Sequence, residues 1–193
     1  MQIKIGVSAR HIHLTKEHLE ILFGHNYRLE LLKELSQPGE FASQEKVNLK
    51  TEKDIIEGVR VLGPLRSYTQ VEISKTDAVK LGINPPVRES GDLAVSSPIT
   101  VIGPKGTIEL EEGCIIATRH IHLTSEDVKK YQLEGLSKVK VLVGGVKGGI
   151  MDNVSLRVSD DYVFEMHIDT DDSNAHLINQ GDCGTIIIGD DIV

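Results

Sequence analysis

One six-residue motif occurs twice in this chain of 193 residues. The sequence Arg-His-Ile-His-Leu-Thr stands at residues 10–15 and again at residues 119–124. Each copy follows a β-prone run and ends on a threonine with acidic residues just after it, which is the pattern of a helix N-cap. An identity of this length is not expected by chance, so we infer an internal duplication in which each copy leads from a strand into a short helix.

The rest of the sequence reads as short strands. Aromatic residues make up only 4% of the chain and Trp is absent, so the core must rest on Val, Ile and Leu, which favour strands. We therefore expect a mainly β protein with short helices, made of two similar small domains. The predicted division places the first repeat at 1–92, with an insertion at about 24–60, and the second at 93–193.

Composition excludes several functions. The formal net charge of −8 repels nucleic acid. No run reaches the length and apolar character of a membrane-spanning helix, and the N-terminus lacks the apolar stretch of a signal peptide. Cys114 and Cys183 are too few for a disulfide framework, so we expect reduced thiols and a cytoplasmic protein.

The repeated motif has the spacing of a metal site. Residues two apart in a strand point to the same face, so both histidines of a motif can aim at one point. A weaker echo between residues 69–74 and 164–169 adds a third candidate ligand to each repeat. Three ligands leave one position open, as in catalytic zinc sites. The predicted ligands of two zinc ions are His11, His13, Glu72, His120, His122 and His167.

Other residues near these motifs are weaker candidates. Arg66 precedes Glu72 by a few residues, and a loop arginine there could bind an anion beside a metal. Arg10 and Arg119 point to the opposite strand face from the histidines, where we expect them to pair with carboxylates. Cys114 shares a strand face with the second motif, which leaves an acyl-cysteine as an alternative.

Taken together, these stretches resemble a known family, the phosphotransacylases of the propanediol-utilisation type, or phosphate propanoyltransferases. The resemblance extends over nearly the whole chain. The matching stretches are residues 7–14, 37–39, 60–66, 69–74, 86–92, 119–123 and 166–170.

The resemblance implies two β-barrel domains with two zinc ions. It places His11, His13 and Glu72 on one zinc, which the sulfur of coenzyme A (CoA) can join, and the three remaining histidine ligands on the other. It makes Arg66 the catalytic phosphate-binding residue and puts Ser90 near the phosphate. The residues it assigns to the CoA pocket are Gln37, Pro38 and Gly39.

The expected reaction converts a short-chain acyl-CoA and phosphate into an acyl phosphate and CoA. The acyl-CoA is acetyl-CoA or propanoyl-CoA. Direct transfer is preferred, because no Ser-His-Asp or Cys-His arrangement is evident. A dinuclear zinc hydrolase is the alternative, although Leu14 and Thr15 follow His13 where a hydrolase of the His-x-His-x-Asp-His type would continue its motif. A non-enzymatic metal-binding barrel is a third possibility. Iron, cobalt and manganese remain alternatives to zinc.

The expected partners are acyl-CoA and phosphate, with neither nucleic acid nor membrane. A homodimer and functional coupling to an acyl kinase stay open. Relatives that are packaged into bacterial microcompartments carry an extension ahead of the first strand. In this sequence the strand begins at about residue 3, so we expect a cytoplasmic enzyme rather than a packaged one.

Overall fold

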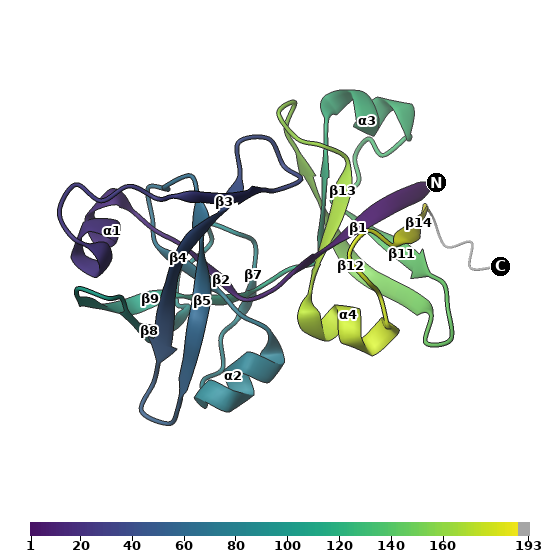
Figure 1. Cartoon of the computed structure of the whole chain (residues 1–193). Coiled ribbons are helices and arrows are strands. Elements are labelled where there is room, and N and C mark those ends of the chain that lie inside the picture. The colour runs from purple at the N-terminus through teal and green to yellow at the C-terminus, as the bar shows by residue number, and fades with distance from the viewer. Residues whose placement is uncertain (189–193) are drawn as a thin grey trace. The chain divides into compact units, whose positions relative to one another are not determined.

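The computed structural model describes residues 1–188, which form a mainly β protein with short helices (Figure 1). The strands are β1 (Gln2–Ser8), β2 (His11–His13), β3 (Leu31–Glu34), β4 (Phe41–Lys50), β5 (Ile55–Gly63), β6 (Gln70–Glu72), β7 (Val87–Arg88), β8 (Ser97–Ile102), β9 (Thr107–Ala117), β10 (His120–Leu123), β11 (Lys138–Val143), β12 (Gly149–Val158), β13 (Glu165–Asp169) and β14 (Cys183–Ile187). The helices are α1 (Lys16–Phe23), α2 (Lys75–Leu81), α3 (Ser125–Lys130) and α4 (Thr170–His176). None of these helices is long and apolar enough to cross a membrane.

The chain divides into two compact units, each a closed six-stranded barrel. The first barrel consists of residues 9–117, and the second consists of residues 1–8 with residues 118–188. Strands of the first barrel follow the order β4-β5-β2-β6-β9-β8, and β8 pairs with β4 to close the circuit. The second barrel has the order β1-β13-β10-β12-β11-β14. The expectation of two similar small β-barrels is therefore confirmed.

The two barrels have equivalent strand pairings. In the first, β2 runs parallel to β5 and antiparallel to β6. In the second, β10 runs parallel to β12 and antiparallel to β13. These equivalences place β6 and β13, which carry the two candidate third ligands, in the same position relative to the repeated motif.

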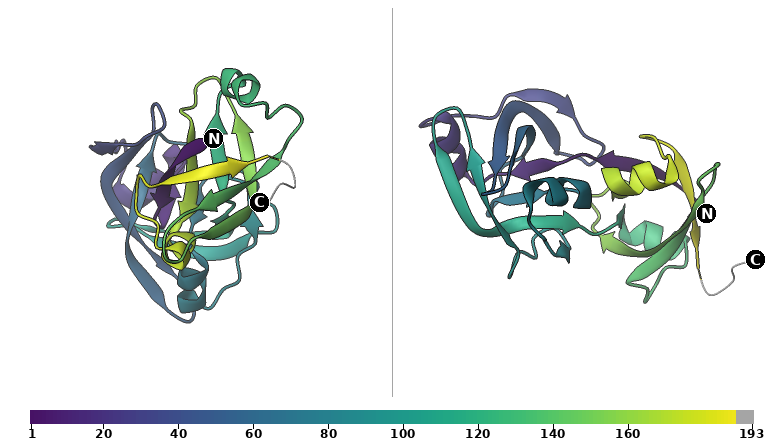
Figure 2. Two further views of the ribbon diagram at one scale, coloured as in Figure 1. Left: turned by 90° about the vertical axis from the view of Figure 1, so that its right-hand side faces the viewer. Right: turned by 90° about the horizontal axis from the view of Figure 1, so that it is seen from below.

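The two repeats exchange their first strands. Strand β1 precedes the first motif, yet it pairs with β13 and β14 of the second barrel. Strand β9 precedes the second motif, yet it pairs with β6 and β8 of the first barrel. In Figures 1 and 2 the purple β1 accordingly lies among green and yellow strands. Each barrel is thus completed by a strand from the other sequence repeat.

This exchange makes the observed units differ from the predicted division at 92/93. A break there would separate β8 and β9 from β4 and β6, with which they pair. The segment predicted as an insertion at 24–60 also contains β4 and most of β5, which are the counterparts of β11 and β12. Its polar composition has a simple cause, because β4 alternates buried and exposed residues. Strand β3 and its flanking loops have no counterpart among the described residues.

Helix caps fix how the chain leaves each motif. The Thr15 side chain accepts a hydrogen bond from the backbone of His18 and caps α1. Thr124 caps α3 and forms a capping box with Asp127. Both threonines were predicted as N-caps from the sequence, so the strand-to-helix reading of the motif is confirmed in both repeats.

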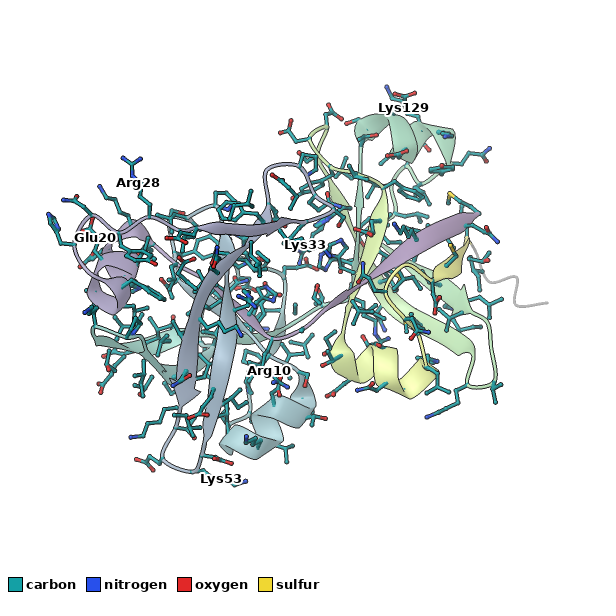
Figure 3. All side chains as sticks on the ribbon, viewed as in Figure 1. Arg10, Glu20, Arg28, Lys33, Lys53 and Lys129 are labelled. Atoms are coloured by element: carbon teal, nitrogen blue, oxygen red, sulfur yellow. The ribbon has the colours of Figure 1, made fainter. Side chains whose placement is uncertain are left out.

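The arginine of each motif joins it to the helix that follows the third-ligand strand. Arg10, which lies beside α2 in Figure 3, pairs with Asp77 through two nitrogen–oxygen contacts of 2.9 Å. Arg119 pairs with Asp172 of α4 through two contacts of 2.7 Å. Paired, parallel contacts of this kind are geometrically specific. The expectation that both arginines pair with carboxylates is confirmed.

Each barrel has its own apolar core. Val, Ile and Leu predominate in both clusters of buried side chains. Ile12 belongs to the first cluster and Ile121 to the second. Because side chains alternate along a strand, the histidines on either side of each isoleucine point away from the core. The barrel core thus orients the histidine pair of each motif.

Candidate functional site

The first barrel brings its three predicted metal ligands together. His11 and His13 lie on β2, and Glu72 lies directly opposite His11 on β6. One candidate ligand atom from each residue lies within 4.8 Å of the others. His11 Nε2 is 3.5 Å from Glu72 Oε2. We call this set the first ligand group.

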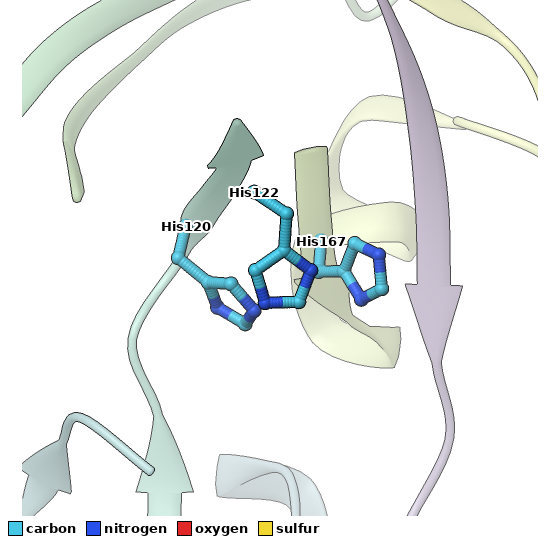
Figure 4. A group of neighbouring side chains, drawn as sticks. All are labelled: His120, His122 and His167. Atoms are coloured by element: carbon cyan, nitrogen blue, oxygen red, sulfur yellow. The ribbon is translucent and has the colours of Figure 1, made fainter. Parts of the chain in front are cut away.

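The second barrel repeats the arrangement with three histidines, shown in Figure 4. His120 and His122 lie on β10, and His167 lies opposite His120 on β13. Their candidate ligand atoms also lie within 4.8 Å of one another. The ring centroids are separated by 4.7 to 5.3 Å. We call this set the second ligand group.

Backbone carbonyls orient the leading histidine of each group. His11 Nδ1 lies 2.9 Å from the carbonyl of Ala9, and His120 Nδ1 lies 2.8 Å from that of Thr118. A carbonyl can only accept, so each Nδ1 carries the proton and each Nε2 keeps its lone pair. That lone pair is what a metal requires, and a carbonyl in this position is a common outer partner of ligating histidine.

The second histidine of each motif has a buried nitrogen with an unmet hydrogen-bonding capacity. Nδ1 of His13 and Nδ1 of His122 have no hydrogen-bond partner among the described residues. A buried polar atom without a partner costs free energy, which a bound cation would offset at these positions. Both groups therefore fit a divalent metal on the donor atoms that they present.

Electrostatics keep these two imidazoles neutral. Burial, with the neighbouring charges of His11 and Arg66, lowers the pKa of His13 to about 2. Burial, with His120 and His167, lowers the pKa of His122 to about 2. A neutral imidazole is the metal-binding form, so both residues are ready to act as ligands at neutral pH.

His11 behaves differently because a carboxylate faces it. Burial opposes its protonation, but the Glu72 carboxylate and the Ala9 carbonyl outweigh burial and raise the pKa of His11. The negative charge of Glu72 thus makes the space between the two side chains favourable for a proton. A metal cation would take the place of that proton between His11 and Glu72.

A polar network joins Arg66 to the first ligand group. Arg66 donates through Nη1 to Ser90 Oγ and through Nη2 to Glu40 Oε1, each at 3.1 Å. Gln70 Nε2 donates to Ser90 Oγ at 2.8 Å and to Glu72 Oε1 at 2.5 Å. Ser90 is therefore two hydrogen bonds, and Arg66 three, from the candidate metal ligand Glu72.

Backbone contacts hold this network in place. The Arg66 amide donates to the carbonyl of Leu14 at 2.9 Å, which ties the arginine loop to the residue after the first motif. The Gly91 amide donates to Gln70 Oε1 at 2.8 Å. These contacts fix the positions of Arg66 and Ser90 relative to the ligand group before any substrate binds.

Residues 37–39 form a tight turn between β3 and β4. Gln37 is buried, and Gly39 has a φ of 77°, a conformation that favours glycine. Glu40 follows directly, and its amide donates to the carbonyl of Gln37 at 3.1 Å. Through Glu40 the turn is joined to Arg66, although its assignment to CoA stays a prediction.

Sequence reasoning did not identify Gln70 and Glu40. Gln70 had a usable signal, because it stands two residues before Glu72 and so shares its strand face. Glu40 had none, because its partner Arg66 is distant in the chain and belongs to a loop. Its role depends on tertiary structure alone.

Cys114 does not have the properties of a nucleophile. Its side chain is fully buried in the core of the first barrel. Burial raises the pKa of the thiol to about 12, so the reactive thiolate is scarce at neutral pH. The alternative of an acyl-cysteine intermediate loses its support.

A duplicated barrel with a histidine-rich ligand group in each copy defines a protein with two candidate metal centres. A family model described as phosphate propanoyltransferase matches residues 4–179. The chain belongs to the phosphate propanoyltransferase family, and it is an acyltransferase.

Relatives of the same description are similar over most of their length. The phosphate propanoyltransferase of Thermotoga maritima is 50% identical over 186 residues, which cover 96% of this chain and 89% of the relative. That of Lachnoclostridium phytofermentans is 47% identical over 186 residues, covering 96% and 87%. That of Priestia megaterium is 48% identical over 184 residues, covering 95% and 85%.

Proposed function

We propose that this protein transfers a short acyl group, acetyl or propanoyl, between CoA and phosphate, with two zinc ions per chain. The observation that carries the proposal is the connected set of Arg66, Ser90, Gln70 and Glu72. This set connects the Arg66 guanidinium by hydrogen bonds to a group suited to a divalent metal, which supports a phosphate site there. The names of the relatives supply the substrate class.

In this reaction a phosphate oxygen attacks the thioester carbonyl, the carbon–sulfur bond breaks, and CoA leaves as a thiolate. Arg66 binds and orients phosphate through parallel N–H donors, with the Ser90 hydroxyl beside it. Zinc ions held by the two ligand groups would supply Lewis acidity toward the phosphate oxygens and the departing sulfur. No protein nucleophile is needed, which agrees with the inert environment of Cys114.

The remaining assignments follow from the same proposal. Gln37, Pro38 and Gly39 would contact CoA, because their turn leads into Glu40 beside Arg66. An acyl phosphate is a substrate for acyl kinases, so coupling to such an enzyme is expected. Both cysteines are free, which fits a reducing cytoplasm. Self-association into a homodimer is compatible with all of these features.

A thiol-release assay tests the function. Acetyl-, propanoyl- and butanoyl-CoA are incubated with the protein, with and without phosphate, and free CoA is measured. We expect release that depends on phosphate, with acyl phosphate formed in equal amount. Release without phosphate would identify a hydrolase instead, and no release from any thioester would identify a binding protein. The ranking of the three thioesters gives the acyl preference.

A further inference from the structure

The two ligand groups differ at one ligand and at one neighbour of that ligand. Glu72 in the first group corresponds to His167 in the second, since each lies opposite the leading histidine of its motif. The residue opposite the other histidine of the motif is Gln70 in the first barrel and Glu165 in the second. Where the ligand changes from carboxylate to imidazole, the neighbour thus changes from amide to carboxylate.

Each neighbour is buried and in contact with its ligand. Gln70 donates through Nε2 to Glu72 Oε1 at 2.5 Å. Glu165 Oε2 lies 3.0 Å from Nε2 of His167. Gln70 and Glu165 are 0% and 3% exposed, so solvent does not replace them as partners.

The chemistry of the two pairs is complementary in each case. A carboxylate ligand is oriented by a donor, and the Gln70 amide donates without adding a second negative charge. An imidazole ligand is oriented by an acceptor of its second N–H, and a carboxylate is a common and effective one. With Nε2–H directed at Glu165, Nδ1 of His167 keeps the lone pair that a metal requires.

Strand β1 passes beside the carboxylate in the second barrel. Gly6 lies opposite His167, and a Cβ atom at Gly6 would come within 3.4 Å of the Glu165 carboxyl carbon. The corresponding place in the first barrel is Ile115, opposite Glu72. The barrels thus differ around this pair in the strand beside it as well.

We propose that Gln70 and Glu165 are positioning residues, each chemically matched to the third metal ligand of its own barrel. Each barrel then has one carboxylate at its ligand group. In the first barrel this carboxylate is itself a ligand, and in the second it is the hydrogen-bond partner of a ligand. This inference rests on the metal-binding part of the proposed function.

The first experiment removes the negative charge of the acceptor in the second barrel. In a full-length chain carrying His11→Ala and His13→Ala, zinc binds at the second group alone, and its affinity is measured by competition with a chromophoric chelator. Glu165→Gln in this background keeps the shape of the side chain but not its charge. We expect zinc affinity to fall by roughly ten- to a hundredfold, the usual cost of losing such a partner.

The second experiment is a rescue in the first barrel. In a full-length chain carrying His120→Ala and His122→Ala, Glu72→His alone should bind zinc poorly, because the Gln70 amide oxygen is an uncharged and weaker acceptor than a carboxylate. Adding Gln70→Glu recreates the Glu165–His167 pair and should restore affinity by roughly tenfold or more. A residue that only filled space would give equal affinities in the single and double variants.

The outcomes separate this inference from the proposed function. Unchanged zinc affinity in Glu165→Gln, or no gain on adding Gln70→Glu, would overturn the matched pairing alone. A wild-type chain that binds no divalent metal would overturn both this inference and the metal-binding part of the function. Thermal unfolding of each variant confirms that its barrel is intact before titration.

Discussion

At the residue scale, the contacts of Arg66 bear most directly on the proposed phosphate site. Its guanidinium is shared between Glu40 and Ser90, and its backbone is tied to Leu14. An arginine that only neutralised Glu40 could be replaced without changing the Michaelis constant for phosphate. An arginine that binds phosphate also has further N–H donors for the substrate, and the two roles can be separated by kinetics.

We expect Arg66→Ala to remove most acyl transfer and to raise the Michaelis constant for phosphate. A lost charge-assisted contact costs about 1.5–3 kcal/mol, or roughly ten- to a hundredfold. Arg66→Lys should recover only a little activity, because an ammonium lacks the parallel donors of a guanidinium. Metal content should stay unchanged, since arginine is not a ligand. Steady-state kinetics with phosphate varied, alongside elemental analysis, measure both quantities.

A matched control is Arg28→Ala, which removes an exposed arginine of the same barrel, labelled in Figure 3. It should leave turnover and the Michaelis constant for phosphate unchanged. If Arg66→Ala behaves in the same way as this control, Arg66 is only a loop residue and the proposed phosphate site is wrong.

At the element scale, the exchanged strands decide which fragments can fold. The second barrel needs β1 between β13 and β14, although β1 belongs to the first repeat in sequence. A barrel that lacks one strand exposes two edges and part of its core, and is not expected to fold stably. Ile3 and Ile5 of β1 are themselves members of that core.

We therefore expect a fragment of residues 9–117 to fold, and a fragment of residues 93–193 to remain unfolded. Attaching residues 1–8 ahead of 118–193 should restore folding. Ser8 lies opposite Asp169, and residue 118 lies at the same level on the other side of β13, about 10 Å away by strand spacing. A Gly-Ser linker of about four residues spans that distance.

Circular dichroism and thermal unfolding of the three fragments provide the measurement. Cooperative unfolding of 93–193 without strand 1–8 would show that β1 is dispensable. Failure of the linked fragment alone would instead point to a requirement for the first barrel.

At the scale of the whole molecule, the duplication supplies two ligand groups with separate structural support. The apolar clusters of the two barrels are distinct, and each group lies on strands of a single barrel. The barrels can thus lose a ligand group without losing their cores. Activity, by contrast, is proposed to require both groups in one reaction.

We expect His11→Ala with His13→Ala to lower the metal content from about two ions per chain to about one, and to reduce acyl transfer to background. His120→Ala with His122→Ala should do the same through the other barrel. Both variants should retain cooperative unfolding. Elemental analysis and the thiol-release assay measure these outcomes. Near-native turnover in either variant would show that one group suffices.

The sequence by itself determined the duplication, the mainly β fold, the helix caps and the three residues of each ligand group. These features depend on local rules, since alternation along a strand and the spacing of a cap act within a few residues. Even the candidate third ligands, Glu72 and His167, could be predicted, because the repeat aligned two strands that each pair with a motif.

Only the tertiary structure decided which barrel each strand joins. Strands β1 and β9 are local in the sequence to one repeat, but their pairing partners lie in the other. The tertiary structure also decided that Glu40 contacts Arg66 and that Glu165 contacts His167. The physical reason is the same in each case. Strand pairing and side-chain contacts across strands join residues far apart in the chain, and no local pattern specifies them.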